Sequence, residues 1–459
     1  MKGSVNNVIE AIGNTPIVKL DPVFTGVKSE IYVKLEYLNP GGSIKDRIGS
    51  YILDQALKKG LVKPGGTIIE GTSGNTGVGI AMWAALNKMK CIFVLADKQS
   101  KEKIDNLRAF GAKVVVCPTN VEPEDPRSYY SVSKRLSETI PNSYYVNQYE
   151  NLWNRETHFH TTGPEIYKQT GGEFDIFMAG VGTGGTISGT AAFLKTVMPE
   201  VKVVGVDCVG SIVAQYAKTG DKSGAHSYVL EGLGEDFIPG NYNFDVIDDW
   251  VVVDDKESFI MTRKLLSKQA IYSGGSSGAA IAGAIRYAKN LKEPKKILVI
   301  LPDSGNRYSS KIFNDDWMSD NGYKESTFNV QIKDAIEEIG KNQNQIFSLP
   351  DTASLGDAIK LMNEKGISQV PIMSGEEVKG VLSEKDLLKP LYDNEFSIND
   401  SVSLLLNSKF IKIEETELIS QITDNLLNRE VVLITKGGKP SMILTNIDIL
   451  EYISKHGTY

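Results

Sequence analysis

The sequence predicts an α/β protein built on parallel sheets covered by helices, followed by a smaller α+β region with an internal repeat. Over residues 1–320, short apolar runs rich in β-branched residues alternate with amphipathic helical stretches, and Gly, Pro or Asp bounds the runs. Residues 346–459 repeat one strand, turn, strand and helix pattern. We therefore expect a first domain at 1–320, a linker at 321–345 and a second domain at 346–459.

Five apolar runs have the composition of strands buried on both faces of a sheet. They are KCIFVLA (90–96), AKVVVCP (112–118), FDIFMAG (174–180), VKVVGVD (201–207) and KKILVILPD (295–303). Helical patterns such as GVGIAMWAALNKM and TISGTAAFLKTVM lie between them. Strands that alternate with helices favour parallel pairing, because a parallel connection needs a crossover.

A polar stretch, KESTFNVQIKDAIEEIGKNQNQ (324–345), reads as linker that is partly helical. Beyond it, residues 370–388 align without gaps on residues 432–450, at an offset of 62. Each copy places a hydroxyl residue three positions before an aspartate, and the two pairs are Ser383 with Asp386 and Thr445 with Asp448. Such a pair can be a helix N-cap. Its recurrence favours a role in binding a ligand with a ribose diol.

Composition excludes several classes of function. The 459 residues are 41% hydrophobic and 23% charged, as in a globular protein, and the net charge of −7 gives no footprint for nucleic acid. No apolar run has the length of a membrane span, and the first residues lack the pattern of a secretory signal, so we expect a cytoplasmic protein. Three widely spaced cysteines and four histidines predict no disulfide framework and no metal site.

The stretch NPGGSIKDR (39–47) places Lys45 behind a glycine pair. Glycines let a backbone approach a ligand closely, and a lysine held away from water can lose its proton and act as a nucleophile or base. The alternative is a solvated surface turn. Three glycine loops elsewhere in the chain decide between these interpretations.

The loop GVGTGGT (180–186) follows an apolar run and opens a helix. Its glycines satisfy G-x-G-x-x-G, and Asp207 ends the next predicted strand, which is the pattern of a dinucleotide site. Elementary physics supports a narrower conclusion: the loop offers backbone N–H groups, with the hydroxyls of Thr183 and Thr186, to some phosphate.

Two further loops repeat this chemistry. EGTSGNTGVG (70–79) carries four polar side chains before a helix and suits a carboxylate, and YSGGSSGAAIAGAI (272–285) carries Ser276 and Ser277 at a helix start. A nicotinamide protein has no use for the lysine motif. A phosphorylated aldehyde cofactor needs a phosphate cradle, a lysine for covalent attachment and a polar partner for its ring nitrogen.

These stretches resemble the cystathionine β-synthases, pyridoxal-phosphate enzymes of the tryptophan-synthase β-like fold, also called fold type II. The resemblance rests on IGNTPIVKL, NPGGSIKDR, EGTSGNTGVG, NQYEN, GVGTGGTISG, EGLGEDFIP, SGGSSGAA and LPDSGNRYSSKIFNDDWM. The C-terminal repeat looks like the paired adenosyl-binding (Bateman) module, a tandem of CBS motifs, that such synthases often carry. The resemblance thus covers nearly the whole chain.

The resemblance implies a role for each matching residue. Lys45 would bind pyridoxal phosphate covalently and then move the substrate's Cα proton. The cofactor's ring hydroxyl would meet Asn75, its ring nitrogen Ser276, and its phosphate Gly182, Thr183, Gly184, Gly185 and Thr186. The amino-acid carboxylate would bind Thr72, Ser73, Thr76 and Gln148, and Tyr149 would lie near the ring. A neutral hydroxyl at the ring nitrogen makes a weaker electron sink than an aspartate would, which favours β-elimination.

Two departures from the family pattern affect what the resemblance implies. The animal enzymes carry an N-terminal haem segment, whereas the catalytic pattern here begins about ten residues from the start, so haem is not expected. Glu235 stands where many eukaryotic relatives have tyrosine, which leaves the choice between L-serine and O-acetylserine open.

The leading hypothesis is a β-replacement that condenses L-serine with L-homocysteine, regulated by an adenosyl ligand at Ser383, Asp386, Thr445 and Asp448. S-adenosylmethionine is the first candidate for that ligand, with AMP or ATP next. The runner-up is cysteine synthesis from O-acetylserine and sulfide. A remote alternative is a nucleotide-sensing protein with an inactive enzyme domain. Relatives with this fold are usually dimers or tetramers, so we expect a homodimer or homotetramer.

Overall fold

The described chain divides into two compact units, Met1–Lys324 and Glu325–Tyr459. The computed structural model describes residues 3–72, 74–97, 99, 101–118, 121, 125–324, 330–340, 346–375, 377–407, 410–419, 422, 426 and 431–456. Among these residues, no helix is both long enough and apolar enough to pass through a membrane. The first unit contains two sheets, and the second contains two small sheets of its own.

The larger sheet of the first unit has six strands in the order β1-β2-β10-β7-β8-β9. They are β1 (Ile17–Lys19), β2 (Glu30–Leu35), β7 (Ile176–Gly180), β8 (Lys202–Cys208), β9 (Asp249–Val253) and β10 (Lys296–Leu301). β1 pairs antiparallel with β2, and the other pairs are parallel. Three of the runs expected as parallel strands form β7, β8 and β10, which confirms the prediction for this sheet.

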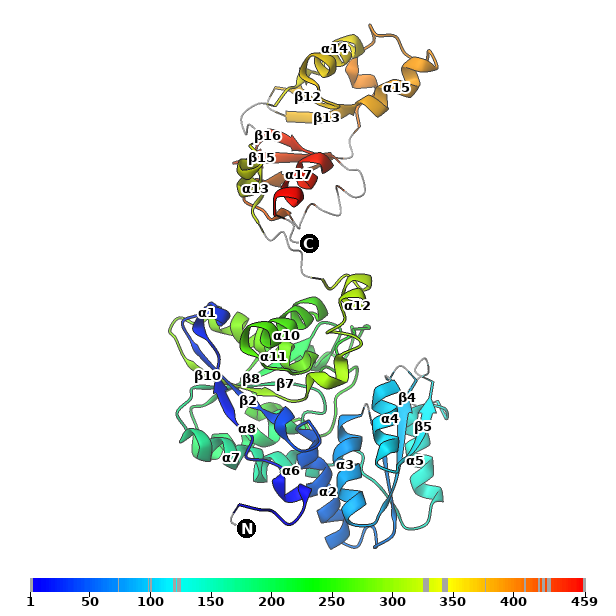
Figure 1. The fold of residues 1–459 in the computed structure, drawn as a ribbon, viewed down its shortest axis with the longest axis vertical. Coiled ribbons are helices and arrows are strands. Elements are labelled where there is room, and N and C mark those ends of the chain that lie inside the picture. The colour runs from blue at the N-terminus through cyan, green and yellow to red at the C-terminus, as the bar shows by residue number, and fades with distance from the viewer. Residues whose placement is uncertain are drawn as a thin grey trace. The chain divides into compact units, whose positions relative to one another are not determined.

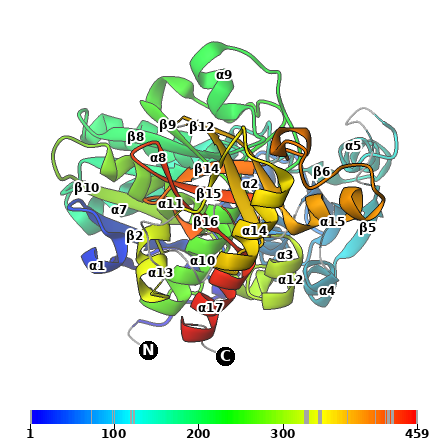
Figure 2. The same ribbon diagram turned by 90° about the horizontal axis from the view of Figure 1, so that it is seen from above.

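The smaller sheet has the order β5-β4-β3-β6, and all its pairs are parallel. Its strands are β3 (Thr67–Gly71), β4 (Lys90–Ala96), β5 (Lys113–Cys117) and β6 (Ser143–Tyr145). The two remaining predicted runs are β4 and β5. This sheet lies to one side of the unit with α4 and α5 beside it, as two perpendicular views show (Figures 1 and 2).

Helices cover both faces of each sheet, as the alternation of strands and helices predicts. The helices of the first unit are α1 (Pro22–Thr25), α2 (Lys45–Lys58), α3 (Asn75–Leu86), α4 (Lys101–Ala109), α5 (Tyr129–Thr139), α6 (Trp153–His160), α7 (Thr162–Thr170), α8 (Gly185–Val197), α9 (Val213–Thr219), α10 (Asp255–Gln269), α11 (Gly275–Lys289) and α12 (Asp315–Asp320). One face of the larger sheet packs against α10 and α11, and the other packs against α7, α8 and α9.

Glycines bring α2 and α3 into close contact next to Lys45. A Cβ atom at Gly49 would lie 2.5 Å from the carbonyl carbon of Gly79, and a Cβ at Gly79 would lie 2.7 Å from the carbonyl oxygen of Lys45. No side chain could occupy either position without moving a backbone. Gly49 on α2 and Gly79 on α3 therefore let α3 pack directly against the start of α2, which positions Lys45.

The second unit contains two three-stranded sheets, ordered β11-β12-β13 and β14-β15-β16. Its elements are α13 (Ile332–Glu338), β11 (Leu349–Pro350), α14 (Leu355–Lys365), β12 (Gln369–Ser374), β13 (Glu377–Ser383), α15 (Glu384–Tyr392), β14 (Phe410–Glu414), β15 (Val431–Lys436), β16 (Lys439–Leu444) and α17 (Asn446–His456). Helix α13 lies inside the stretch that reads as linker. It buries Ile332 and Ile336 in a core shared with β15 and β16.

The internal repeat appears in the structure at the offset that the sequence indicates. β12 and β15 begin 62 residues apart, as do β13 and β16 and the helices α15 and α17. The register irregularity between Ile372 and Met373 recurs between Ile434 and Thr435, again 62 residues later. Because the strands, the helix and the β-bulge all recur at the same offset, the two segments are two copies of one structural unit.

Candidate active site

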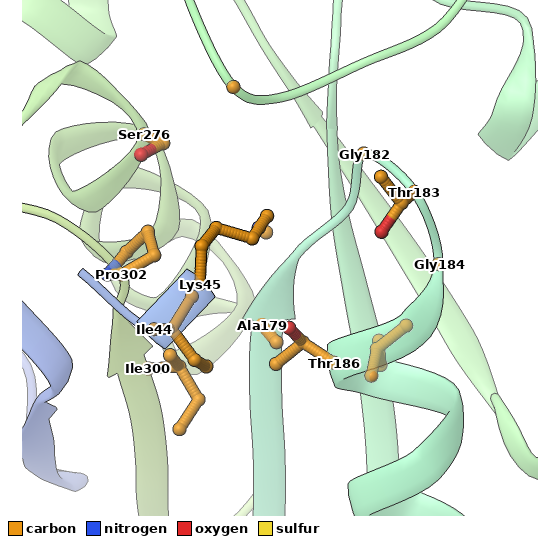
Figure 3. Close-up of a pocket in the computed structure, with 13 residues that line it drawn as sticks. Ile44, Lys45, Ala179, Gly182, Thr183, Gly184, Thr186, Ser276, Ile300 and Pro302 are labelled. Atoms are coloured by element: carbon orange, nitrogen blue, oxygen red, sulfur yellow. The ribbon is translucent and has the colours of Figure 1, made fainter. Parts of the chain in front are cut away.

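Lys45 is the first residue of α2 and lines a cavity of the first unit. Its side chain rises between Ser276 on one side and the loop of Gly182 and Thr183 on the other (Figure 3). Burial lowers the pKa of Lys45, and the carboxylates of Asp303 and Glu235 oppose this shift only in part. The amine therefore releases its proton more readily than a solvated lysine, as a nucleophile or base requires.

A buried network of charges holds the start of α2. The Arg47 side chain, two residues after Lys45, donates to both carboxylate oxygens of Glu36 at 2.7 Å. It also donates to Glu165, 2.9 Å away, and Lys34 donates to the same carboxylate at 2.6 Å. Two cations and two carboxylates balance in charge, which allows them to share a site sealed from water.

The loop that connects β7 to α8 has the form of a phosphate cradle. Gly184 caps α8 in the left-handed region with φ of 81°, and a Cβ atom there would lie 2.7 Å from the ring of Tyr242. The hydroxyl of Tyr242 donates to the carbonyl oxygen of Gly182 at 2.8 Å. The cavity lining includes Gly182, Thr183, Gly184 and Thr186, and Gly185 begins α8 behind them. The N–H groups of this helix start therefore face the cavity that Lys45 enters.

Helix α6 contacts the two hydroxyls of the cradle. Asn154 Nδ2 donates to Thr183 Oγ1 at 3.1 Å, and His158 Nε2 lies 3.3 Å from Thr186 Oγ1. Burial, with Arg47 adding to it, lowers the pKa of His158 well below its usual range, so the ring is neutral. No pattern in the sequence predicts a role for Asn154 or His158.

Asn75 lies at the start of α3 and donates from Nδ2 to Asp303 Oδ2 at 2.9 Å. Within the described part of the chain, its buried Oδ1 atom has no hydrogen-bond partner. A buried amide oxygen without a partner fits the ring hydroxyl expected at this position. Ser276 lies in the first turn of α11 and lines the cavity opposite the cradle. Together with the cradle and Lys45, these groups fit a phosphorylated pyridine aldehyde.

The residues expected to bind a carboxylate lie on two neighbouring loops. Thr76 Oγ1 donates to Gln148 Oε1 at 2.7 Å, so the structure brings these two side chains together. Thr72 is buried, and its hydroxyl accepts from Gly74 N at 3.0 Å. Ser73 lies outside the described residues. None of the three described side chains belongs to the lining of the Lys45 cavity, among the residues that the structure describes.

Glu70 supports the loop that carries Gln148. Its carboxylate, at the end of β3, accepts from Asn147 N at 2.7 Å and from Gln148 N at 3.3 Å. Asn147 has φ of 51°, a left-handed conformation that this anchoring helps to maintain. Burial raises the pKa of Glu70 to about 8. No pattern in the sequence predicts a role for Glu70, although Glu70 opens the stretch 70–79.

Tyr149 and Glu235 lie among aromatic side chains. The Tyr149 ring packs edge-on against Phe237 with centroids 5.2 Å apart, and Tyr130 lies 6.0 Å from Tyr149. Burial and the charge of Glu235 raise the pKa of Tyr149 well above its usual range. A Cβ atom at Gly182 would lie 3.8 Å from Glu235 Oε1, which places this carboxylate beside the cradle.

The dinucleotide interpretation of the glycine loop does not fit the position of Asp207. This residue is buried, and its two oxygens accept from Cys208 N at 2.9 Å and Ala214 N at 2.8 Å. A carboxylate occupied in this way organises the turn into α9 and is not presented to a ribose. The spacing from the glycines to Asp207 is therefore a structural coincidence.

Asp303 is a further residue of the site for which the sequence motifs predict no role. It follows β10, is 2% exposed, and accepts from Asn75 and from the Tyr308 hydroxyl, the latter at 2.7 Å. Its position after a parallel strand is the available signal, because ligands of such sheets bind beyond the carboxyl ends of the strands. Asn154 and His158 sit inside a helix, where no such signal exists.

In the second unit, each of the two hydroxyl–aspartate pairs forms hydrogen bonds at the first turn of a helix. Ser383 Oγ donates to Asp386 Oδ2 at 2.6 Å, and Thr445 Oγ1 donates to Asp448 Oδ2 at 2.7 Å. The same aspartate oxygens accept from the backbone N–H of Ser383 at 2.9 Å and of Thr445 at 2.8 Å. The capping interpretation of each pair therefore holds. A ligand role for the same side chains stays a prediction.

Two protein-family models match this chain, and the first of them covers the site. A family model described as pyridoxal-phosphate dependent enzyme matches residues 8–303, and a CBS-domain model matches residues 336–393. The first match covers the cradle, Lys45 and Asp303 together. The fold and the site thus define the class as a pyridoxal-phosphate-dependent enzyme of fold type II joined to a CBS-motif unit.

Individual relatives narrow the class. A cystathionine β-synthase of Dictyostelium discoideum is 36% identical over an alignment of 463 residues, which covers 98% of this chain and 93% of that protein. A cysteine synthase of Helicobacter pylori is 41% identical over 313 residues, 67% of this chain and 98% of the relative. The crystal structure of an O-acetylserine dependent cystathionine β-synthase from Helicobacter pylori superposes with a TM-score of 0.61 at 39% identity, covering 67% of this chain and 98% of that one. This chain belongs to the cystathionine β-synthase family of pyridoxal-phosphate-dependent lyases.

Proposed function

We propose that the first unit catalyses a β-replacement that joins L-serine and L-homocysteine to give L-cystathionine and water. The observation that carries this proposal is the meeting of Lys45, the Gly182–Thr186 cradle and Ser276 in one cavity (Figure 3). Full-length similarity to a protein named cystathionine β-synthase supports the same choice.

One set of residues binds the cofactor, and another set binds the substrate. Gly182, Thr183, Gly184, Gly185 and Thr186 hold the phosphate, Asn75 binds the ring hydroxyl, and Ser276 meets the ring nitrogen. When bound, pyridoxal phosphate supplies an aldehyde for covalent attachment and an aromatic ring that withdraws electrons from the substrate's Cα. Ser276 carries no charge, so it leaves the ring nitrogen a modest electron sink and favours loss of the β-substituent.

Lys45 moves the proton. Its amine, whose pKa burial lowers, takes the proton from Cα of L-serine, and the β-hydroxyl leaves with a proton as water. The proton that leaves in the water is the one Lys45 took from Cα. The thiol of L-homocysteine then gives its proton to the Lys45 amine as its sulfur bonds to Cβ, and Lys45 passes that proton back to Cα. Thr72, Ser73, Thr76 and Gln148 orient the substrate carboxylate, and Tyr149 packs beside the ring.

A second candidate reaction uses O-acetylserine as the donor. Glu235, whose carboxylate lies beside Gly182, leaves this donor open, because L-serine and O-acetylserine differ mainly at the leaving group. The similar Helicobacter pylori proteins, named as a cysteine synthase and as an O-acetylserine dependent synthase, support the same alternative.

Product analysis with each pair of substrates tests the proposal. The purified protein is supplied with pyridoxal phosphate and with L-serine or O-acetylserine, each against L-homocysteine or sulfide. We expect L-cystathionine from L-serine at the highest kcat/KM, and no turnover in Lys45→Ala. Preference for O-acetylserine and sulfide selects the second reaction. A wild type that forms no absorbing adduct with pyridoxal phosphate overturns both.

We also propose that the second unit binds an adenosyl ligand at Ser383 and Asp386 or at Thr445 and Asp448, with S-adenosylmethionine preferred over AMP or ATP. Recurrence of the same pair in both copies supports this assignment. Calorimetry with Asp448→Ala tests it, and the control is Asp357→Ala, which removes the capping box of α14 in the same way. Ligand affinity lost in the first variant and kept in the second supports the proposal. Equal affinities in the two variants contradict the role of Asp448.

Assembly into a homodimer or homotetramer completes the proposal and follows the usual state of related enzymes. Light scattering on the full chain measures the molar mass directly. A mass equal to one chain at micromolar concentration contradicts it.

A further inference from the structure

Asn154 connects the two loops that the proposed function uses for different ligands. Its side-chain nitrogen donates to the carbonyl oxygen of Gln148 at 2.8 Å and to Thr183 Oγ1 at 3.1 Å. Gln148 belongs to the loop expected to hold the substrate carboxylate, and Thr183 belongs to the phosphate cradle. Asn154 is 1% exposed, so its hydrogen bond to Gln148 is buried, and its hydrogen bond to Thr183 is partly buried at the wall of the cavity.

The chemistry of an amide makes this bridge directional. The NH₂ group has two hydrogens, and each of them goes to one of the two loops. Because Thr183 Oγ1 accepts from Asn154, its own hydroxyl hydrogen remains available to the cavity that Thr183 lines. A phosphate oxygen can only accept hydrogen bonds, so Asn154 turns Thr183 into the donor that a phosphate needs.

Close packing of α6 against the start of α8 fixes the position of Asn154. A Cβ atom at Gly185 would collide with the Asn154 amide, so the glycine that begins α8 allows the two elements to meet. One turn later on α6, His158 Nε2 lies 3.3 Å from the hydroxyl of Thr186. Helix α6 thus supports both hydroxyls of the cradle, and through Asn154 it also reaches the carboxylate loop.

We propose that Asn154 is a positioning residue that couples the two binding loops, so that occupation of the cradle by phosphate strengthens binding of the substrate carboxylate, and the reverse. The inference rests on the proposed function, because it assumes pyridoxal phosphate in the cradle. Coupling of this kind is reciprocal, and both affinities change by the same factor.

Asn241 provides a matched control. Its side-chain nitrogen donates to the same Gln148 carbonyl oxygen at 2.7 Å and to the Tyr149 carbonyl oxygen at 2.6 Å. It is fully buried, like Asn154, but both of these hydrogen bonds stay on the carboxylate loop. Asn241→Ala therefore loosens that loop without removing a bond to the cradle.

The test measures two equilibrium affinities by absorbance. Pyridoxal phosphate is titrated into the apoprotein, and L-alanine, which has the substrate carboxylate but no leaving group, is titrated into the loaded protein. We expect Asn154→Ala to weaken both affinities by about tenfold. Asn241→Ala should weaken binding of L-alanine alone.

A double-mutant cycle identifies the bridge itself. Thr183→Val should weaken L-alanine binding in the otherwise wild-type chain, and should have little further effect on it when Asn154 is already alanine. If Asn154→Ala does not fold, Thr183→Val removes the acceptor of the same hydrogen bond. Its affinity for L-alanine, measured at saturating pyridoxal phosphate, then tests the coupling.

Two results overturn the inference, and they are distinguishable. If Asn154→Ala keeps the wild-type affinity for pyridoxal phosphate and behaves like Asn241→Ala, the coupling does not exist while the proposed function stands. If the wild-type apoprotein binds no pyridoxal phosphate, the proposed function fails and the inference fails with it.

Discussion

The two units satisfy their buried polar groups in different ways. Around the cavity of the first unit, partners come from distant parts of the chain, as with Asn75 and Asp303 or Thr76 and Gln148. At the candidate ligand positions of the second unit, each aspartate bonds to a residue three positions away, as Asp386 does with Ser383. The first kind of contact exists only when the whole unit has folded, whereas the second forms with the first turn of its helix. Substitutions in the two units should therefore differ in cost.

The largest cost is expected for Arg47→Met. Methionine removes the guanidinium from Glu36 and Glu165 and leaves two carboxylates short of a partner in a buried site, which should lower the free energy of unfolding by roughly 5 kcal/mol. All four tryptophans lie within residues 1–324, so tryptophan fluorescence in urea reports on the first unit. A loss below about 1 kcal/mol would mean that Lys34 alone compensates both carboxylates.

The second prediction concerns the pH dependence of the first unit. Burial raises the pKa of Glu70 to about 8, so the folded state keeps a proton that the unfolded chain releases above its ordinary pKa of 4.5. The contribution of this group to stability is complete below 4.5 and falls as the pH rises toward 8. Between pH 5 and pH 7 the loss is roughly 3 kcal/mol.

Glu70→Gln removes this titration and keeps the shape of the side chain. The free energy of unfolding, followed by tryptophan fluorescence, should therefore fall less steeply with pH in the variant than in the wild type. Parallel curves for the two proteins between pH 5 and pH 7 would show that Glu70 is ionised throughout, with the N–H groups of Asn147 and Gln148 as sufficient compensation.

A smaller effect is expected at the local caps of the second unit. Ser383→Ala removes the acceptor for the Asp386 N–H at the start of α15 and should cost about 1 kcal/mol. Hydrogen exchange read by mass spectrometry should show faster exchange over residues 384–392, with the first unit unchanged. Ser354→Ala is the matched control, because the capping box of α14 has the same chemistry. Faster exchange in the first unit as well would contradict the local character of this contact.

The smallest effect is expected for the exposed pair of Glu451 and Lys455 on α17. Their charged atoms lie 3.0 Å apart, and the two side chains are 47% and 43% exposed. Lys455→Ala should change the stability of the second unit by no more than about 0.5 kcal/mol, because solvent screens the pair. Thermal unfolding of the full chain at low and high salt measures this, and a change above 1 kcal/mol would show that the pair is not merely superficial.

The fold could be predicted well because its signals are periodic and local. The runs at 90–96 and 295–303 form parallel strands, because a continuous apolar run between helices is typical of a strand that is buried on both faces of a sheet. The repeat was visible because two copies keep one spacing. Lys45, the cradle and Ser276 were found through glycine loops, whose need for close backbone approach leaves a mark on the sequence.

Other residues of the site have no such signal in the sequence. Asn154, His158 and Glu70 lie inside a helix or a strand, where a polar residue can equally serve the element itself. Asp207 shows the opposite error, since a spacing typical of ribose binding belongs to a carboxylate that organises a turn. Asn154, His158 and Glu70 each bond to a partner far along the chain, which pattern alone does not reveal. The partners of Asp207 are backbone N–H groups only one and seven residues away.

By itself, the sequence determined the parallel strands, the repeated unit, the lysine behind a glycine pair and the glycine loops at helix starts, because each depends on residues a few positions apart. Only the tertiary structure decided which buried polar groups meet: Asn75 with Asp303, Glu70 with the Gln148 loop, and Asn154 with both loops at once. The physical reason is that a hydrogen bond between distant segments is specified by the packing that brings them together, and that packing is a property of the whole unit.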